Sequence, residues 1–357
     1  MTDIKALTRE NIRSLVPYSS ARDEYSGEGA VLLDANENPY NGPINRYPDP
    51  HQVELKKRIS AIKKVPVSNL FLGNGSDEAI DLLIRAFCEP GRDNILAIKP
   101  TYGMYKVCAD INGVEYRDVL LDDQFRVNAD RLISLSDGHS KLLFLCSPNN
   151  PTSNSFEPEA IKELIGRFEG LVILDEAYID FSTRPSFTLE LERHPNLVIL
   201  QTLSKAWGMA GIRLGMAFAV KEIIDILNRI KYPYNISLLT QQTALKSLSY
   251  VAAKEKWVKN ILEQRKLLQQ KLSRFAIVKD ILPSDANFLM VRFDDPKSVF
   301  DFLIGRKIIV RDRSRVALCN GYLRITVGSA EDNMLLINAL NDFSSVQSSR
   351  IPKMQHP

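Results

Sequence analysis

The chain has 357 residues, of which 45% are hydrophobic and 25% charged, the composition of an ordinary globular protein. Its length exceeds what one compact core usually holds, and therefore predicts a large domain joined to a smaller one. The formal net charge is only +3, and no run of lysine or arginine is dense enough for a nucleic-acid surface. We therefore exclude nucleic acid as a partner.

The N-terminal sequence MTDIKALTRE is polar, and no apolar run in the chain is long enough to cross a bilayer. These features predict a cytoplasmic protein without an export signal or a membrane anchor. The four cysteines are far apart and lack CxxC spacing, so we expect reduced thiols. The four histidines are equally scattered, which argues against a metal site and against a Ser-His-Asp triad.

Residues 1–45 are predicted to form an N-terminal arm with a segment of the small domain, because they end in a stretch rich in proline and asparagine. Residues 46–240 are predicted to form the large domain, in which short apolar runs alternate with helical periodicity. The runs NILAIKP, KLLFLCSP, LVILDEAY and LVILQTLS suit strands that helices cover on both faces. This pattern predicts an α/β fold with a mainly parallel sheet between helices.

The remaining part of the chain is predicted to lie outside that sheet. Residues 241–275 are polar and amphipathic, as expected of long linking helices. Residues 276–350 again alternate strand and helix patterns and would form the smaller α/β domain, and residues 351–357 form a tail.

Polar residues follow the predicted strands at the positions where ligands of open α/β sheets gather. Asp175 follows the run LVIL and is expected to be buried, so that its carboxylate needs a cationic partner or serves as a helix cap. Asn149 and Asn150 precede Pro151, which predicts a tight turn with a cis peptide bond or, alternatively, a plain surface turn.

The segment QTLSKAWGMAGIRLG places Lys205 after Ser204 and eight residues before Arg213. A lysine near another cation has its ammonium form disfavoured, which makes the amine a better nucleophile toward a carbonyl. Arg213 and Ser204 together suit a phosphate, and glycines such as Gly215 would let the backbone approach a ligand. The alternative is a solvent-exposed lysine in a glycine-rich loop.

A second candidate anion site lies in FLGNGSDEAIDLLIRAF, where Gly73 and Gly75 lead into a predicted helix. The first amides of that helix, at Ser76 and Asp77, would point at an anion. The dinucleotide fingerprint fails because Glu78 occupies the position of its third glycine, and no Walker A sequence is present. The anion is therefore predicted to belong to a ligand other than a dinucleotide.

One ligand satisfies all of these sites. It needs an aldehyde for Lys205, a phosphate for Arg213 and the helix terminus, and a protonated ring nitrogen beside Asp175. Pyridoxal 5′-phosphate carries all three groups, and its protonated ring withdraws electrons from a developing carbanion. A carboxylate beside the ring nitrogen keeps that proton in place.

The motifs NGSDEAI, SPNNPT, DEAY and SKAWGMAGIRLG, in this order, resemble those of the fold-type I aminotransferases over nearly the whole chain. LDANENPY, NRYPDP and GYLRITVGS resemble the branch of that family that acts on L-histidinol phosphate. The resemblance implies a seven-stranded sheet and a homodimer with shared active sites. It also implies transamination between L-histidinol phosphate and 2-oxoglutarate, giving imidazole acetol phosphate and L-glutamate, in histidine biosynthesis.

The resemblance further implies roles for particular residues. Lys205 would hold the cofactor covalently and move the proton at the substrate carbon, and Asp175 would pair with the ring nitrogen. Tyr178 and Asn150 would hydrogen-bond the phenolic oxygen, and Tyr102 would stack on the ring. The cofactor phosphate would contact Ser76, Asp77, Thr202, Ser204, Arg213 and, from the neighbouring subunit, Tyr47.

For the substrates, the resemblance implies an arginine clamp in the small domain. Arg324 would bind a carboxylate of glutamate, and Arg311 would join it to hold the phosphate of histidinol phosphate. Asn36 and Tyr18 would close over the substrate from the N-terminal arm.

Two features depart from the family pattern. Ser153 stands where NPTG has glycine, which we expect to cost little if its backbone angles are ordinary. Arg313 and Arg315 add charge beside the clamp, and we interpret both as a solvent-exposed loop face without an assigned role. An aromatic aminotransferase, a threonine-phosphate decarboxylase and a non-catalytic protein of the same fold are the alternative functions.

Overall fold

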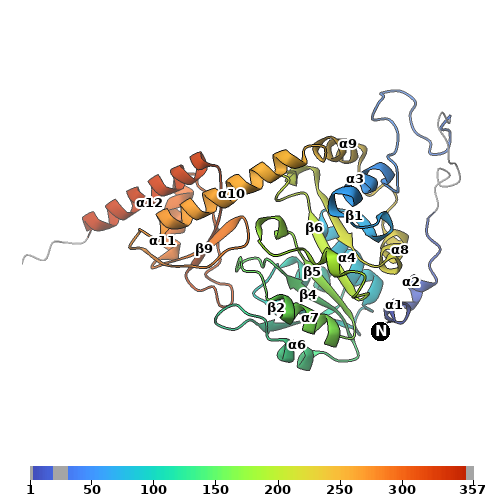
Figure 1. Cartoon of the computed structure of the whole chain (residues 1–357), viewed down its shortest axis with the longest axis horizontal. Coiled ribbons are helices and arrows are strands. Elements are labelled where there is room, and N and C mark those ends of the chain that lie inside the picture. Colours follow the sequence, from blue (N-terminus) through green and yellow to red (C-terminus); the bar gives the residue numbers. More distant parts are fainter. Residues whose placement is uncertain (1–2, 19–30, 351–357) are drawn as a thin grey trace, which may run out of the picture.

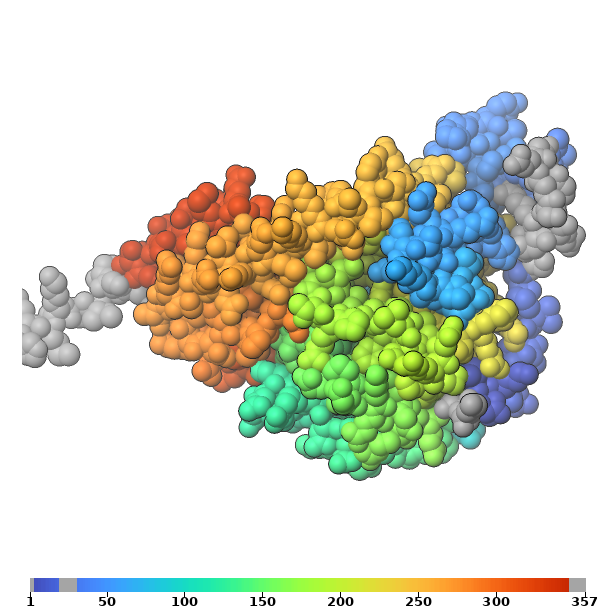
Figure 2. All heavy atoms as spheres, in the orientation of Figure 1, coloured from blue at the N-terminus to red at the C-terminus, as the bar shows by residue number. Residues whose placement is uncertain are grey.

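The structure is a computed structural model that describes residues 3–18 and 31–350, with side chains described as far as residue 346. The N-terminal segment forms two short helices, α1 (Ile4–Leu7) and α2 (Glu10–Arg13). They are tied to the large domain by an ion pair between Arg9 and Glu89, with an N–O distance of 3.0 Å. Residues 31–52 form neither helix nor strand, and Figures 1 and 2 show this segment projecting from the body of the protein.

The large domain is built on a seven-stranded sheet in which six strands run in one direction and β7 (Leu214–Phe218) runs in the opposite direction. The four apolar runs predicted to be strands are confirmed as β2, β4, β5 and β6. In spatial order the strands are β1 (Leu70–Asn74), β7 (Leu214–Phe218), β6 (Leu197–Thr202), β5 (Leu171–Asp175), β4 (Ser140–Cys146), β2 (Asn94–Lys99) and β3 (Glu115–Leu120).

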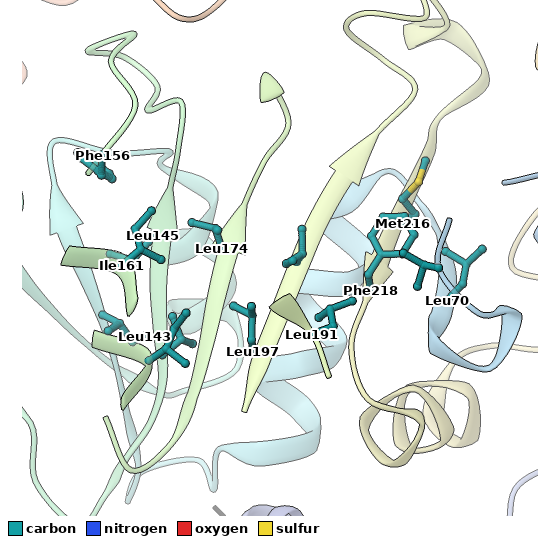
Figure 3. Packing of buried hydrophobic residues seen from close by; sticks show 14 of the residues in the cluster. Leu70, Leu143, Leu145, Phe156, Ile161, Leu174, Leu191, Leu197, Met216 and Phe218 are labelled. Atoms are coloured by element: carbon teal, nitrogen blue, oxygen red, sulfur yellow. The ribbon is translucent and has the colours of Figure 1, made fainter. Parts of the chain in front are cut away.

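Helices cover both faces of this sheet, which explains why its central strands are apolar throughout. In β5, Val172 and Leu174 contribute to one core, and Leu171 and Ile173 contribute to the other. Figure 3 shows the first core, in which side chains from β4 to β7 and β1 pack together. The first core includes α3 (Val53–Lys63), α6 (Ala129–Leu135), α7 (Pro158–Arg167) and α9 (Leu238–Ser247). The second includes α4 (Ser76–Phe87), α5 (Met104–Ile111) and α8 (Lys221–Ile230).

Short 3₁₀ helices complete the large domain at Val67–Asn69, Ile179–Phe181, Phe187–Glu190 and Ala210–Ile212. The 22-residue helix α10 (Val251–Leu272) leads from the large domain to the small one, as the polar sequence after residue 240 predicts (Figure 1). Among the described residues, no helix is both long and apolar enough to span a membrane.

The small domain contains a four-stranded antiparallel sheet with its own hydrophobic core. Its strands are, in spatial order, β10 (Arg311–Asp312), β11 (Tyr322–Thr326), β9 (Phe288–Phe293) and β8 (Val278–Ile281). Its helices are α11 (Pro296–Gly305) and α12 (Ala330–Arg350), which pack against each other and, through α12, against α10. The predicted α/β architecture with a mainly parallel seven-stranded sheet and a smaller C-terminal domain is confirmed. The limits of the two domains, residues 46–240 and 276–350, stay a prediction.

Candidate active site

A cavity of about 630 Å³ lies where the carboxyl ends of β4, β5 and β6 face the β10–β11 hairpin of the small domain. The motifs that the sequence singled out therefore meet at one place, as expected for an open α/β sheet. The predicted site residues that line the cavity are Ser76, Asp77, Tyr102, Asn150, Asp175, Tyr178, Thr202, Ser204, Lys205, Arg213, Arg311 and Arg324.

Asp175 ends β5 with only 3% of its surface exposed. Its Oδ2 accepts a hydrogen bond from the Tyr105 hydroxyl at 2.8 Å, and its Oδ1 accepts one from the Ala177 amide at 3.0 Å. Burial raises the pKa of the carboxyl to about 6, against the ordinary 3.8. Within the described chain a phenol and a backbone amide, and not a cationic side chain, hydrogen-bond the carboxylate. The cationic partner expected from the sequence stays a prediction.

Tyr105 is a residue that the sequence analysis missed. It is fully buried on α5, where its ring stacks on Phe144 of β4 with 4.7 Å between the ring centroids. The signal in the sequence was the pair of tyrosines in TYGMY, of which only Tyr102 was selected. Tyr105 holds the Asp175 carboxylate by this hydrogen bond but does not itself line the cavity, whereas Asp175 does.

Lys205 lies in the turn after β6, where the amide of Gly208 donates to its carbonyl oxygen at 3.0 Å. The Lys205 Nζ lies 5.4 Å from the centroid of the Tyr178 ring. The side chain is partly buried, and burial together with the charge of Arg324 lowers the pKa of the amine below its ordinary value. The alternative of a solvent-exposed lysine is therefore wrong, and the lowered pKa increases the share of the neutral, nucleophilic amine.

An anion cradle forms where β7 returns beside β1. Helix α4 begins at Ser76 without a side-chain cap, after Gly75 with a φ of +76°. The Gly75 amide donates to the Arg213 carbonyl at 2.7 Å, and the Arg213 Nη2 lies 3.5 Å from the Asp77 Oδ2. The first-turn amides of α4 and the Arg213 guanidinium thus meet in one place, which suits a phosphate.

Gly215 serves the cradle in a different way from the one expected. A Cβ at this position would lie 2.1 Å from the Ser76 backbone nitrogen, so any side chain would push β7 away from the start of α4. The close approach that requires glycine is therefore between two protein backbones and not between the backbone and a ligand.

Hydroxyl groups surround the remaining wall of the cavity. The Thr202 hydroxyl donates to the Ser204 Oγ at 2.9 Å, and the Tyr102 hydroxyl donates to the Asp77 Oδ1 at 3.1 Å. Burial raises the pKa of both Tyr102 and Tyr178 above the ordinary value. Both phenols therefore stay protonated and can donate a hydrogen bond at neutral pH.

The SPNNPT turn is buried, so the alternative of a plain surface turn is wrong. The Ser147–Pro148 and Asn150–Pro151 peptide bonds are both cis. Asn149 is fully buried and its Nδ2 donates to the Pro100 carbonyl at 3.0 Å. This turn holds Asn150 at the cavity, where its Oδ1 accepts a hydrogen bond from the Arg324 Nη1 at 2.5 Å.

Ser153 does not have the ordinary backbone angles that the sequence analysis assumed. Its φ is +67°, in the left-handed region that favours glycine, and its side chain is fully buried. Its hydroxyl oxygen lies 2.6 Å from the Thr152 carbonyl oxygen and 3.1 Å from the Pro283 carbonyl oxygen, and its one proton can be donated to either. Such a hydrogen bond offsets part of the cost of the strained backbone.

The β10–β11 hairpin carries the two arginines that are predicted to form the clamp, Arg311 and Arg324. Arg311 lies directly opposite Arg324 in the antiparallel register. Arg313 also lines the cavity and is partly buried, and its Nε is buried without a hydrogen-bond partner among the described residues. The interpretation as a solvent-exposed loop face is therefore wrong for Arg313, although it is correct for the exposed Arg315.

Three predicted site residues do not line this cavity within the described chain: Tyr18, Asn36 and Tyr47. Tyr18 is 72% exposed and Tyr47 is 51% exposed, and the Tyr47 ring stacks on Tyr234 with 4.5 Å between centroids. Their roles stay a prediction. Across residues 3–18 and 31–350, no group of three or more histidine, cysteine, aspartate or glutamate side chains could hold a metal ion.

Comparison with known proteins identifies the class of enzyme that this fold and cavity define. Residues 24–340 match the family described as Aminotransferase class I and II, and the chain belongs to that family. Within it, the chain groups with histidinol-phosphate aminotransferases. It is 56% identical over 344 residues to the protein of that name from Bacteroides fragilis (strain YCH46), which covers 96% of this chain and 100% of the relative.

Solved structures agree with this assignment. The histidinol-phosphate aminotransferase from Clostridium acetobutylicum superposes with a TM-score of 0.78 at 25% identity, covering 85% of this chain and 92% of the other. The enzyme of that name from Sinorhizobium meliloti, in complex with pyridoxal-5′-phosphate, gives a TM-score of 0.77 at 21% identity, covering 85% and 84%. This second likeness shows the shared fold.

Proposed function

We propose that this chain catalyses transamination between L-histidinol phosphate and 2-oxoglutarate, giving imidazole acetol phosphate and L-glutamate, in L-histidine biosynthesis. The observation that carries the proposal is the meeting of three groups in one cavity. These are the Lys205 amine, the buried Asp175 carboxylate and the arginine hairpin. The 56% identity to a protein named for this substrate supports the choice among aminotransferase reactions.

The residues of the cavity fit pyridoxal 5′-phosphate as the cofactor. Two observations support this fit: the Asp175 carboxyl is buried with a raised pKa, and the first turn of α4 has no side-chain cap. A positive ring nitrogen would neutralise the Asp175 carboxylate, and a phosphate would accept hydrogen bonds from the free amides of the first turn of α4. When bound, the cofactor supplies an aldehyde and an electron-withdrawing ring. Lys205 would hold the aldehyde covalently, and Arg213 would help to hold the phosphate.

Different side chains of the cavity have different roles in the proposed reaction. The Lys205 amine takes the proton from the amine-bearing carbon of the substrate and later returns one, because its lowered pKa suits both steps. Asp175 holds the proton on the ring nitrogen. Tyr178 and Asn150 would donate hydrogen bonds to the phenolic oxygen, and Tyr102 would cover one face of the ring.

Arg324 is proposed to bind the anionic group of either substrate. Replacing it with alanine is expected to lower kcat/KM for both glutamate and histidinol phosphate by about 100-fold, since a charge-assisted bidentate contact is lost in each case. Stopped-flow measurement of the two half-reactions, one amine at a time, gives both values. A loss confined to one amine would refute the shared clamp.

We also propose a homodimer in which the arm of one chain completes the site of the other. The described arm exposes a row of apolar side chains, which a partner chain would cover. Its exposed apolar residues are Val31, Leu33, Tyr40, Ile44 and Tyr47. Light scattering of the purified protein should give twice the chain mass of 40.3 kDa, and a monomer at micromolar concentration would refute the proposal.

A half-reaction assay tests the function itself. The purified enzyme carrying the cofactor is mixed with histidinol phosphate, phenylalanine, tyrosine or O-phosphothreonine, and the absorbance of the cofactor is followed. Histidinol phosphate is expected to convert the cofactor to its amino form with the highest kcat/KM. Faster conversion by an aromatic amino acid, or release of carbon dioxide from O-phosphothreonine, would favour one of the two alternative enzymes.

A further inference from the structure

The β10–β11 hairpin presents three arginines to the cavity, and within the described residues none of the three forms a salt bridge with an acid. Arg311 lies opposite Arg324, and pairing continues one step further because the Arg313 amide donates to the Tyr322 carbonyl at 3.0 Å. Side chains alternate along an extended strand, so Arg313 shares the face of Arg311 whereas Asp312 points to the other face. Consistent with this, the three arginines line the cavity and Asp312 does not.

Such an arrangement is unfavourable for the protein alone. Like charges directly opposite each other destabilise a pair of strands. The Asp312 Oδ1 accepts from the Ser314 amide at 2.8 Å, and the Arg324 guanidinium already donates to Asn150. Burial and the neighbouring Arg311 lower the pKa of Arg313, in agreement with this crowding of positive charge. An anion in the cavity would relieve this repulsion.

Arg313 differs from its neighbours in having a buried donor to offer. Its Nε is buried and lacks a hydrogen-bond partner in the part of the chain that the structure describes. An unpaired buried donor is costly, so a ligand oxygen at this position would recover a lost hydrogen bond. Arg315, two residues further on, lies in the turn after β10, is exposed and does not line the cavity.

The number of guanidinium groups exceeds what a carboxylate can use. A carboxylate has one charge and two oxygens, which one planar guanidinium can bind in a bidentate manner. A phosphate monoester has a charge of about −1.5 to −2 at pH 7 and three terminal oxygens, so it can accept from a second and a third guanidinium. Glutamate has two such carboxylates at opposite ends of the molecule, so no single one of its groups can use three neighbouring guanidiniums, whereas the phosphate of histidinol phosphate can.

We infer that Arg313 is a specificity-determining residue, which binds the phosphate of histidinol phosphate and contributes little to the binding of glutamate. This inference rests on the proposed function. The two arginines then have different roles. Arg324 binds both substrates, whereas Arg313 recognises the additional charge and the third oxygen of the phosphate.

The test compares Arg313→Gln with Arg315→Gln, which removes the same charge from an exposed position nearby. In Arg313→Gln, kcat/KM for the histidinol phosphate half-reaction is expected to fall about 10- to 100-fold, mainly through KM. The glutamate half-reaction should change by less than about 3-fold. Arg313→Lys should recover part of the loss because it keeps the charge, and Arg315→Gln should match the unmodified enzyme for both amines.

Inorganic phosphate provides a readout that is independent of the amine. Its inhibition constant against the glutamate half-reaction should rise by about 10-fold in Arg313→Gln and stay unchanged in Arg315→Gln. Equal losses for both amines, no loss for either, or an unaltered inhibition constant would overturn the inference. Thermal melting establishes that each variant is folded. If Arg313→Gln does not fold, Arg313→Lys is compared with the unmodified enzyme for the two amines and for inorganic phosphate.

The two proposals fail in different ways. If the unmodified enzyme accepted glutamate but not histidinol phosphate, the proposed function would be wrong, and the phosphate inhibition constants alone would decide the role of Arg313. If the unmodified enzyme accepted histidinol phosphate and Arg313→Gln retained its preference, the function would stand and the inference would be wrong.

Discussion

Replacing Lys205 with alanine is expected to lower the rate of both half-reactions by about 10³-fold or more while the fold is retained. The side chain lies partly exposed in the cavity wall, so its removal leaves no void in a packed core. It is, however, the amine that would hold the cofactor covalently and move the proton. Burial and the charge of Arg324 lower its pKa, and no other lysine lines the cavity among the described residues.

Visible absorbance is the second measurement for Lys205→Ala. Enzyme incubated with pyridoxal 5′-phosphate and then freed of excess cofactor should be yellow when Lys205 is present, and borohydride should bleach it. The alanine variant should lose the absorbance of the covalent form, and Lys221→Ala, which removes an exposed lysine that does not line the cavity, should keep it. A Lys205→Ala enzyme with substantial turnover would show that another group performs the chemistry.

Replacing Asp175 with asparagine is expected to weaken cofactor binding and to slow both half-reactions by about 10²- to 10³-fold. An amide has nearly the same shape as the carboxylate but cannot hold a positive charge on the ring nitrogen. The Ala177 amide could still donate to the amide oxygen, and the Tyr105 hydroxyl could accept from the amide nitrogen, so the side chain keeps its place and the loss reports mainly on charge. Unchanged kinetics would remove the electron-withdrawing role from the mechanism.

Glu176→Gln is the matched control for Asp175→Asn. Glu176 is the next residue and is equally buried, but its carboxylate accepts from the Phe187 amide at 2.7 Å and from the Gln201 Nε2 at 2.9 Å, away from the cavity. Its replacement is expected to lower the free energy of unfolding and to leave the half-reaction rates nearly unchanged.

The raised pKa of Asp175 also predicts a pH dependence for the protein without cofactor. Between the ordinary value of 3.8 and the folded value of about 6, the folded state holds the proton more tightly than the unfolded state. The contribution of this group to stability is therefore fully present below pH 3.8 and is lost as the pH rises through about 6. Relative to the native sequence, Asp175→Asn should gain roughly 3 kcal/mol in unfolding free energy over this interval. Urea denaturation at a series of pH values measures the difference, and parallel curves would contradict the assigned pKa.

The strands that could be predicted from the sequence are those whose burial on both faces requires an uninterrupted apolar run. β2, β4, β5 and β6 lie inside the sheet and are apolar on both faces, so they could be identified directly. β3 is an edge strand with the polar sequence EYRDVL, and β1 and β7 are each interrupted by glycine, so none of the three was singled out. Their assignment depends on pairing with neighbours that are distant in the chain.

The site shows the same division. Lys205, Asp175 and Arg213 follow predicted strands or lie in a glycine-rich motif, and a cofactor with three distinct groups connects them. Tyr105 could not be identified in this way, because its partner Asp175 is 70 residues away. The small cost expected for Ser153 depended on ordinary backbone angles, which the sequence does not reveal, and its φ is +67°.

The sequence by itself determined which chemical groups this protein brings to its reaction, since strand ends, helix starts and glycine-rich turns have local patterns. Only the tertiary structure decided which of those groups share a cavity and which neighbours tune them. Arg313 and Arg315 illustrate the difference, because the two residues look alike in the chain. Pairing of β10 with β11 directs the first into the cavity, and the turn that follows leaves the second in solvent. Such outcomes depend on contacts between distant residues, and these contacts exist only once the chain has folded.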